Sequence, residues 1–154
     1  MTGTSRRRGW LAIVVACLTG CAGVDYENFR SLPGERWERD RVVAFDVDIP
    51  RPGLYTFMLY VRHTPGVEQA NIACLLTLSR GGVTLAERRA EFLLSDSLGR
   101  WTGDGAFLRT LKTTAGEPLA VDSAGVLRVE VSHRMKNEEL KGIKDIGLHV
   151  YGEE

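Results

Sequence analysis

Residues 43–49 read Val-Ala-Phe-Asp-Val-Asp-Ile, and this alternation decides the fold. Every second side chain is apolar, so an extended chain places the apolar set on one face and the two aspartates on the other. The Pro50–Gly53 segment interrupts the pattern, which resumes from Leu54 to His63 with apolar side chains at the odd-numbered positions 55–61. The two runs predict half-buried strands that pair antiparallel with each other.

The same pattern continues along the rest of the chain. Apolar residues alternate again over 72–78, and the run Val83–Leu94 carries charged residues in its middle, which predicts an edge strand or a bulge. Further strands are expected at 107–112, 127–131 and 146–150, with a short helical turn over Met135–Leu140. About seven or eight strands without a long helix predict an all-β fold, an antiparallel β-sandwich of jelly-roll or Ig-like type, over residues 41–154.

The first twenty residues have the layout of a signal peptide. Arg6, Arg7 and Arg8 form a basic start, and the apolar run Trp10–Leu18 is shorter than the roughly 20 residues of a membrane-spanning helix. Leu18-Thr19-Gly20-Cys21 resembles the lipobox of bacterial lipoproteins, which implies cleavage after residue 20 and lipidation of Cys21. The alternative is an ordinary secretory peptide with a chance cysteine.

The segment after the cysteine is expected to be a tether. Residues 21–40 contain Pro33-Gly34 and mixed charges but no sustained periodicity. Several acyl chains make a lasting membrane anchor, whereas one chain binds reversibly. Ala22 stands where an aspartate would mark retention, and no acidic run follows Cys21, so resemblance to lipoproteins implies an outer-membrane anchor with the domain facing the periplasm.

Composition restricts the classes of function. The 154 residues suit one domain, with 44% hydrophobic and 26% charged residues. Loss of the three arginines of residues 1–20 takes 20 basic residues to 17 against 20 acidic ones, which gives no basic surface for nucleic acid.

Catalytic and metal-binding patterns are also missing from the sequence. The histidines, at 63, 133 and 149, are scattered, and Cys74 fits a buried thiol, so no catalytic residue, metal ligand or cofactor site is expected. The glycine-rich segment Asp96–Gly105 lacks the ligand order of a calcium loop. An enzyme is therefore not expected.

Several segments of the mature chain carry a family resemblance. They are Tyr26–Phe29 leading to Trp37, Phe45–Val47, Tyr60–His63, Asn71-Ile72, Asp96–Gly105, and the closing blocks Val131–Met135 and Leu140–Leu148. Together with the lipoprotein start, they resemble the GldH-type gliding-motility lipoproteins of Bacteroidota. The resemblance implies a non-catalytic envelope lipoprotein that serves the gliding machinery and is linked to type IX secretion. Its partners would be the membrane, through lipid on Cys21, and envelope proteins of that assembly.

Five residues are candidate contact positions for such a partner. They are Arg62, His63, Trp101, His133 and Asp145. Each also has a simpler interpretation, because strand ends and solvated faces account for the histidines and Arg62 with Asp145 fits a surface ion pair.

Two other functions are alternatives to an interaction lipoprotein. A glycan-binding sandwich would use the rings of Trp37, Trp101 and Tyr60, although aromatic rings in sandwiches are more often core. An envelope hydrolase would need a close pair of carboxylates, or a histidine with an orienting acid, in one cleft.

Overall fold

The computed structural model describes residues 25–153, so the predicted signal peptide and the lipidation of Cys21 lie outside the described residues. The described chain is built from strands, with one short 3-10 turn, η1 (Pro33–Glu35). The strands are β1 (Asp25–Ser31), β2 (Arg36–Glu38), β3 (Val43–Ile49), β4 (Gly53–His63), β5 (Asn71–Arg80), β6 (Val83–Leu93), β7 (Arg109–Thr114), β8 (Leu119–Val121), β9 (Gly125–His133), β10 (Glu139–Lys141) and β11 (Ile143–Gly152). The predicted all-β class is confirmed. Within residues 25–153, no helix is long and apolar enough to cross a membrane.

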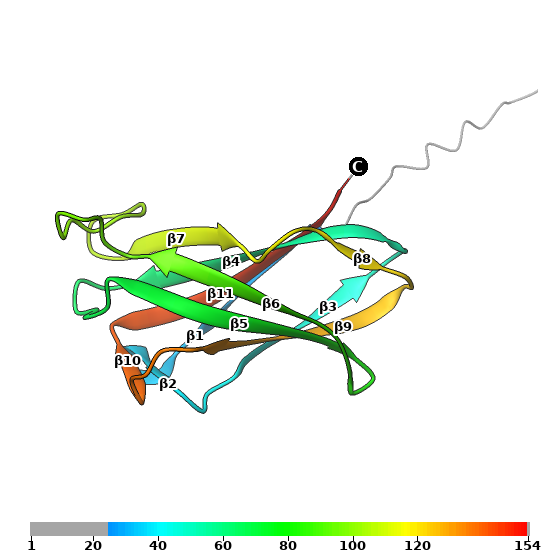
Figure 1. The fold of residues 1–154 in the computed structure, drawn as a ribbon, viewed down its shortest axis with the longest axis horizontal. Coiled ribbons are helices and arrows are strands. Elements are labelled where there is room, and N and C mark those ends of the chain that lie inside the picture. Colours follow the sequence, from blue (N-terminus) through cyan, green and yellow to red (C-terminus); the bar gives the residue numbers. More distant parts are fainter. Residues whose placement is uncertain (1–24, 154) are drawn as a thin grey trace, which may run out of the picture.

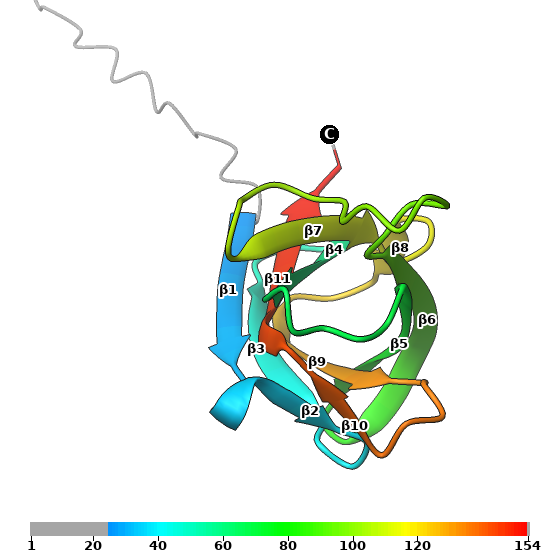
Figure 2. The same ribbon diagram turned by 90° about the vertical axis from the view of Figure 1, so that its left-hand side faces the viewer.

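The strands form two facing sheets and a small strand pair. One sheet has the order β1-β11-β4-β7, with β8 also paired to β4, and the other has the order β3-β9-β5-β6. Strands β2 and β10 pair with each other at one end of the molecule (Figure 1). Figure 2 looks along the sandwich, with β1, β11 and β4 on one side and β5, β6 and β9 on the other. All the pairings are antiparallel, as predicted.

The alternating stretch that predicted the fold behaves as expected in burial but not in pairing. The apolar residues of β3 are all buried and its two aspartates are exposed. However, β3 pairs with β9, whereas β4 pairs with β11, β7 and β8, so the predicted β3–β4 pair is wrong. The intervening Pro50-Arg51-Pro52 contains two prolines, which cannot donate backbone hydrogen bonds to a tight hairpin ladder. The chain uses this segment to cross from one sheet to the other.

The charged strand β6 lies at an edge, as its sequence predicted. It pairs only with β5, and the register shifts at Leu78 and Ser79, which leaves Leu85 as an extra residue in a bulge. The preceding turn uses Gly81 and Gly82, whose φ angles of 55° and 81° lie in the left-handed region that glycine adopts readily.

The folded domain begins earlier than the sequence predicted. Residues 25–31, placed in the tether of residues 21–40, form strand β1, which pairs with β11 from Tyr151 to Asp145. Trp37, also placed in the tether, is fully buried in β2. The expected helical turn at 135–140 is wrong as well, because Glu139–Lys141 pairs with β2 as β10. These short or edge strands raise the number of strands above the predicted seven or eight.

Candidate interaction surface

A row of polar side chains crosses the outer face of the five-stranded sheet. Asp145 on β11 lies directly opposite both Arg62 on β4 and Ser31 on β1. The Ser31 hydroxyl donates a hydrogen bond of 2.6 Å to Asp145 Oδ1, and Arg62 Nη1 lies 3.9 Å from Asp145 Oδ2. The Asp145 side chain is only 7% exposed, whereas Arg62 is 35% exposed. Asp145 therefore holds one end of a guanidinium that still reaches solvent.

Aromatic rings continue this row along the sheet toward the first residues of β1. The Arg62 guanidinium carbon lies 3.7 Å from the centroid of the Phe29 ring, and the rings of Phe29 and Tyr60 are 5.5 Å apart. A cation over a ring face is attracted by the ring quadrupole, by about 0.5–1 kcal/mol at exposed sites and more when desolvated. Burial raises the pKa of Tyr60, so its hydroxyl stays a hydrogen-bond donor at neutral pH.

A glycine makes room for this stack. Gly147 on β11 lies between Phe29 and Tyr60 in register. A Cβ atom added to Gly147 would lie 2.5 Å from Phe29 Cε1, closer than carbon atoms can approach. The phenyl ring therefore lies flat across the glycine, and its upper face receives Arg62.

We call Phe29, Ser31, Tyr60, Arg62 and Asp145 the arginine–aromatic face. It offers a fixed guanidinium, a phenol donor and an apolar ring, which suit the recognition of a carboxylate or carbonyl group beside an apolar side chain. Arginine and tyrosine are also enriched among the residues that dominate protein–protein binding energy. The Asp145 carboxylate is already engaged by two partners, so its role here is to position Arg62.

The other three predicted contact residues lie elsewhere. His63 and His133 are buried at the ends of β4 and β9, and each packs against a tryptophan. The centroid distances are 5.5 Å for His63 with Trp101 and 5.3 Å for His133 with Trp37. Burial lowers the pKa of both imidazoles, so both are neutral at pH 7. The two histidines are therefore core residues without exposed surface for a partner, while Trp101 is partly exposed and covers His63.

The rings considered for glycan binding do not form a common platform. Trp37 is fully buried, and of the other two, Tyr60 contacts Phe29 while Trp101 contacts His63. Trp37 therefore has no exposed face on which a sugar could stack, and the partly exposed rings of Tyr60 and Trp101 pack against different neighbours.

Reactive groups in the described part of the chain are also withdrawn from solvent. Burial raises the pKa of the Cys74 thiol to about 12, which keeps it protonated and unreactive. A hollow of about 930 Å³ lies over β5 and β6, and half of its lining residues are charged, namely Glu87, Arg89, Glu91 and Arg134. Among residues 25–153, no group of three or more His, Cys, Asp or Glu side chains is placed to hold a metal ion.

Fold and surface together define an antiparallel β-sandwich protein with an arginine–aromatic face on one sheet. The chain belongs to the GldH lipoprotein family, whose sequence model matches residues 24–150. No curated protein matches the chain.

Two solved structures are similar over most of the chain, each at low identity. Eiger TNF from S. frugiperda is 11% identical with a TM-score of 0.45, and the match covers 82% of this chain and 91% of that one. Dimeric latent PorU from Porphyromonas gingivalis is 10% identical with a TM-score of 0.35, and the match covers 84% of this chain but only 13% of the PorU chain.

Proposed function

We propose that this protein is a lipid-anchored component of the outer membrane that faces the periplasm and binds another envelope protein of a gliding or type IX secretion-linked assembly. Membership of the GldH lipoprotein family supports the anchor. In this proposal, lipid on Cys21 holds the protein at the membrane and the β-sandwich supplies the binding surface. The role is non-catalytic.

The observation that carries the proposal is the arginine–aromatic face. Its guanidinium is contacted from two sides, by the Asp145 carboxylate at 3.9 Å and by the Phe29 ring at 3.7 Å, and yet remains partly exposed. A long side chain that is already ordered loses less conformational entropy when a partner binds. The face is also built from three different strands, which makes it rigid.

The chemistry of the described residues supports binding rather than catalysis. Nucleophilic catalysis needs an accessible group beside a base. The thiol of Cys74 is buried and protonated, and His63 and His133 face the interior against tryptophan rings.

The experiment replaces Arg62 in the native host and follows spreading, secretion and partner capture. Arg62→Ala should lose spreading and type IX secretion, and cross-linking with mass spectrometry should show loss of one envelope protein, at unchanged levels of the lipoprotein. Arg128→Ala is the matched control, because Arg128 lies on the outer face of the other sheet and is also partly exposed and ion-paired. Normal function of Arg62→Ala, or equal defects in both variants, would contradict the proposed binding face. In a host that does not glide, secretion and partner capture provide the readout.

The anchor itself has a separate test. Mass spectrometry of the N-terminal peptide should show acylated Cys21, and Cys21→Ser should release the protein from the outer-membrane fraction. An unmodified N-terminus that still includes residues 1–20 would refute the lipoprotein part of the proposal.

A further inference from the structure

One end of the sandwich is defined by the start of β1. Asp25 pairs with Tyr151, so β1 begins where β11 ends. The same end carries the 50–52 crossover and the 122–124 turn, because Ile49 pairs with Gly125 and Gly53 pairs with Val121. The Gly81-Gly82 turn lies at this end as well. We call this end of the sandwich the anchor end. Figure 1 shows it opposite the end that carries β2 and β10.

The anchor end is tied closely to the lipidated residue. Three residues separate Cys21 from Asp25 in the sequence. Even a fully extended chain of four residues spans at most about 14 Å. This step rests on the proposed lipidation of Cys21. If that cysteine carries the acyl chains, the first residue of β1 cannot leave the neighbourhood of the lipid headgroups.

Four of the eight exposed large hydrophobic side chains in the described residues lie at this same end, while Val42, Leu93, Leu98 and Phe107 lie toward the opposite end. Leu54, Val83, Leu85 and Val126 are between 48% and 65% exposed. Each is among the first three residues of a strand that begins at the anchor end, namely β4, β6 and β9. Leu85 projects from the bulge of β6. The transfer of such side chains from water into the interfacial region of a bilayer is favourable, because it removes apolar surface from water.

Three acidic residues at the anchor end, two of them highly exposed, have a polar or basic side chain beside them. Asp25 Oδ1 lies 2.7 Å from His149 Nε2, and Asp122 Oδ1 lies 3.8 Å from Arg80 Nη1. Glu153 accepts a hydrogen bond from the Thr56 hydroxyl. These contacts reduce the cost of bringing the acids near a membrane surface.

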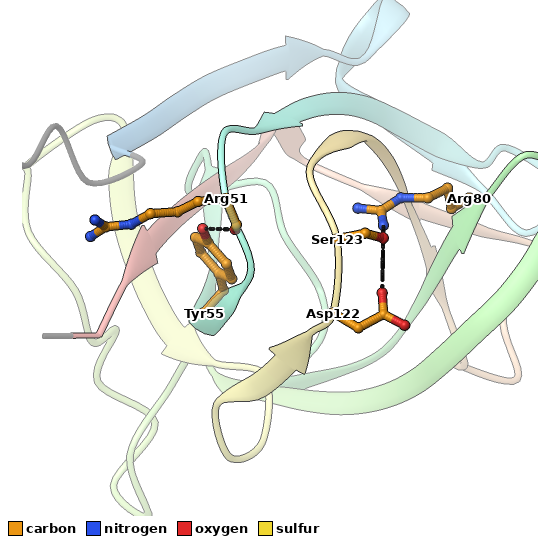
Figure 3. Close-up of polar contacts among 5 residues, drawn as sticks. All are labelled: Arg51, Tyr55, Arg80, Asp122 and Ser123. Carbon is orange, nitrogen blue, oxygen red and sulfur yellow. Dashed lines mark hydrogen bonds and ion pairs between the residues drawn. The ribbon is translucent and has the colours of Figure 1, made fainter.

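Internal contacts also hold the turns at this end. The Tyr55 hydroxyl donates a hydrogen bond of 2.7 Å to the carbonyl of Arg51 in the crossover. Arg80 contacts Ser123 and Asp122 in the 122–124 turn (Figure 3). The Arg51 side chain is left exposed, beside the turn that it helps to form.

We propose that the anchor end rests on the bilayer, with Leu54, Val83, Leu85 and Val126 in the headgroup region. Strand β4 has eleven residues, so at about 3.3 Å per residue the opposite end stands about 33 Å further from the membrane. The loop between β6 and β7, with its exposed Phe107, then points into the periplasm. The arginine–aromatic face lies on the side of the domain and stays open to a partner.

The test measures the depth of added tryptophans in vesicles. The native tryptophans of the folded domain, Trp37 and Trp101, pack at the far end and give a low baseline of quenching. Full-length lipidated protein is reconstituted into phosphatidylcholine vesicles that contain spin-labelled lipid, after mass spectrometry has verified the acylated N-terminus. Val83→Trp, Phe107→Trp and Lys112→Trp then report on the anchor end, the far end and the sheet face. Leu54→Trp is a second probe of the anchor end.

The spin-labelled lipid should quench the fluorescence of the added tryptophan several-fold more in Val83→Trp and Leu54→Trp than in Phe107→Trp and Lys112→Trp. Quenching of Lys112→Trp alone would mean that the domain lies on its five-stranded sheet, and quenching of none would mean that it stands away from the bilayer. Either result overturns the proposed orientation while leaving lipidation intact. An N-terminus without lipid would instead refute the proposed function.

Discussion

The contact between Phe29 and Gly147 predicts that Gly147→Ala destabilises the wild-type protein but stabilises a variant that lacks the Phe29 ring. In the wild-type protein, Gly147→Ala places a methyl group 2.5 Å from Phe29 Cε1. The backbone at Gly147 lies outside the left-handed region, so alanine fits the local conformation and the ring is the obstacle. Phe29 must rotate away, and its contact with Arg62 is lost.

The magnitude follows from two opposing effects. Overpacking that displaces a neighbouring side chain costs about 1–3 kcal/mol. Alanine in a strand is otherwise more stable than glycine by roughly 0.5–1 kcal/mol, because glycine loses more backbone entropy on folding. Gly147→Ala should therefore lower the free energy of unfolding by about 1–2 kcal/mol with Phe29 present. In a Phe29→Ala background, it should raise that free energy by up to about 1 kcal/mol.

The assay is a double-mutant cycle by urea unfolding, followed through the fluorescence of Trp37 and Trp101. Wild type, both single variants and the double variant are compared at one pH and one salt concentration. The coupling energy between positions 29 and 147 should be about 2 kcal/mol, since the residues are in direct contact. The same destabilisation in both backgrounds would refute the packing argument and mean that Gly147 is required by the backbone itself.

Two further predictions concern the buried groups. Because burial lowers the folded-state pKa of His63 and His133, the unfolded chain takes up protons first as the pH falls. The free energy of unfolding should therefore be highest above pH 6.5 and should decline below it by up to about 1.4 kcal/mol per pH unit for each histidine. Urea unfolding between pH 5 and 8 measures this slope, and a flat profile would contradict it. Cys74 in the folded domain should react with a thiol reagent only after urea is added, since its thiol is buried with a pKa of about 12. The test uses protein with acylated Cys21, so that Cys74 is the thiol that is labelled. Rapid labelling of the native protein would show that the strand opens.

Strong alternation made β3 and β5 predictable from sequence. In β3 and β5, every second side chain is apolar and buried, and such a period leaves one assignment of faces. Alternation specifies the face of a strand but not its neighbours. This explains why β3 and β4 were identified as strands and yet assigned to the wrong pairing.

Several edge or very short strands were missed. β1 lies at an edge, and its residues are only half-buried or exposed, so its sequence has no clean period of two. Its structure depends on pairing with β11, more than a hundred residues later in the chain. β2 and β10 have three residues each, too few to show a period, and they form only because they meet each other.

The candidate surface was predictable in part. Arg62 and Asp145 were identified from sequence, and the two residues do lie opposite each other across β4 and β11, although the Asp145 side chain is buried rather than on the surface. Phe29 and Gly147 were missed because their roles arise from register between distant strands. The interpretation of His63 and His133 as contact residues failed because sequence does not reveal that both strands end beneath tryptophans.

The attachment of β1 has a mechanical consequence. In the proposed arrangement, a pull between the membrane and a partner bound at Arg62 would enter the domain at Asp25 and run along β1. Its seven residues are aligned side by side with β11, parallel to that pull, so their backbone hydrogen bonds resist together in shear. An attachment at the far end of β1 would instead let the same bonds open one after another. A lipid anchor on Cys21, as proposed, would therefore pull on the domain through a strand pair loaded in shear.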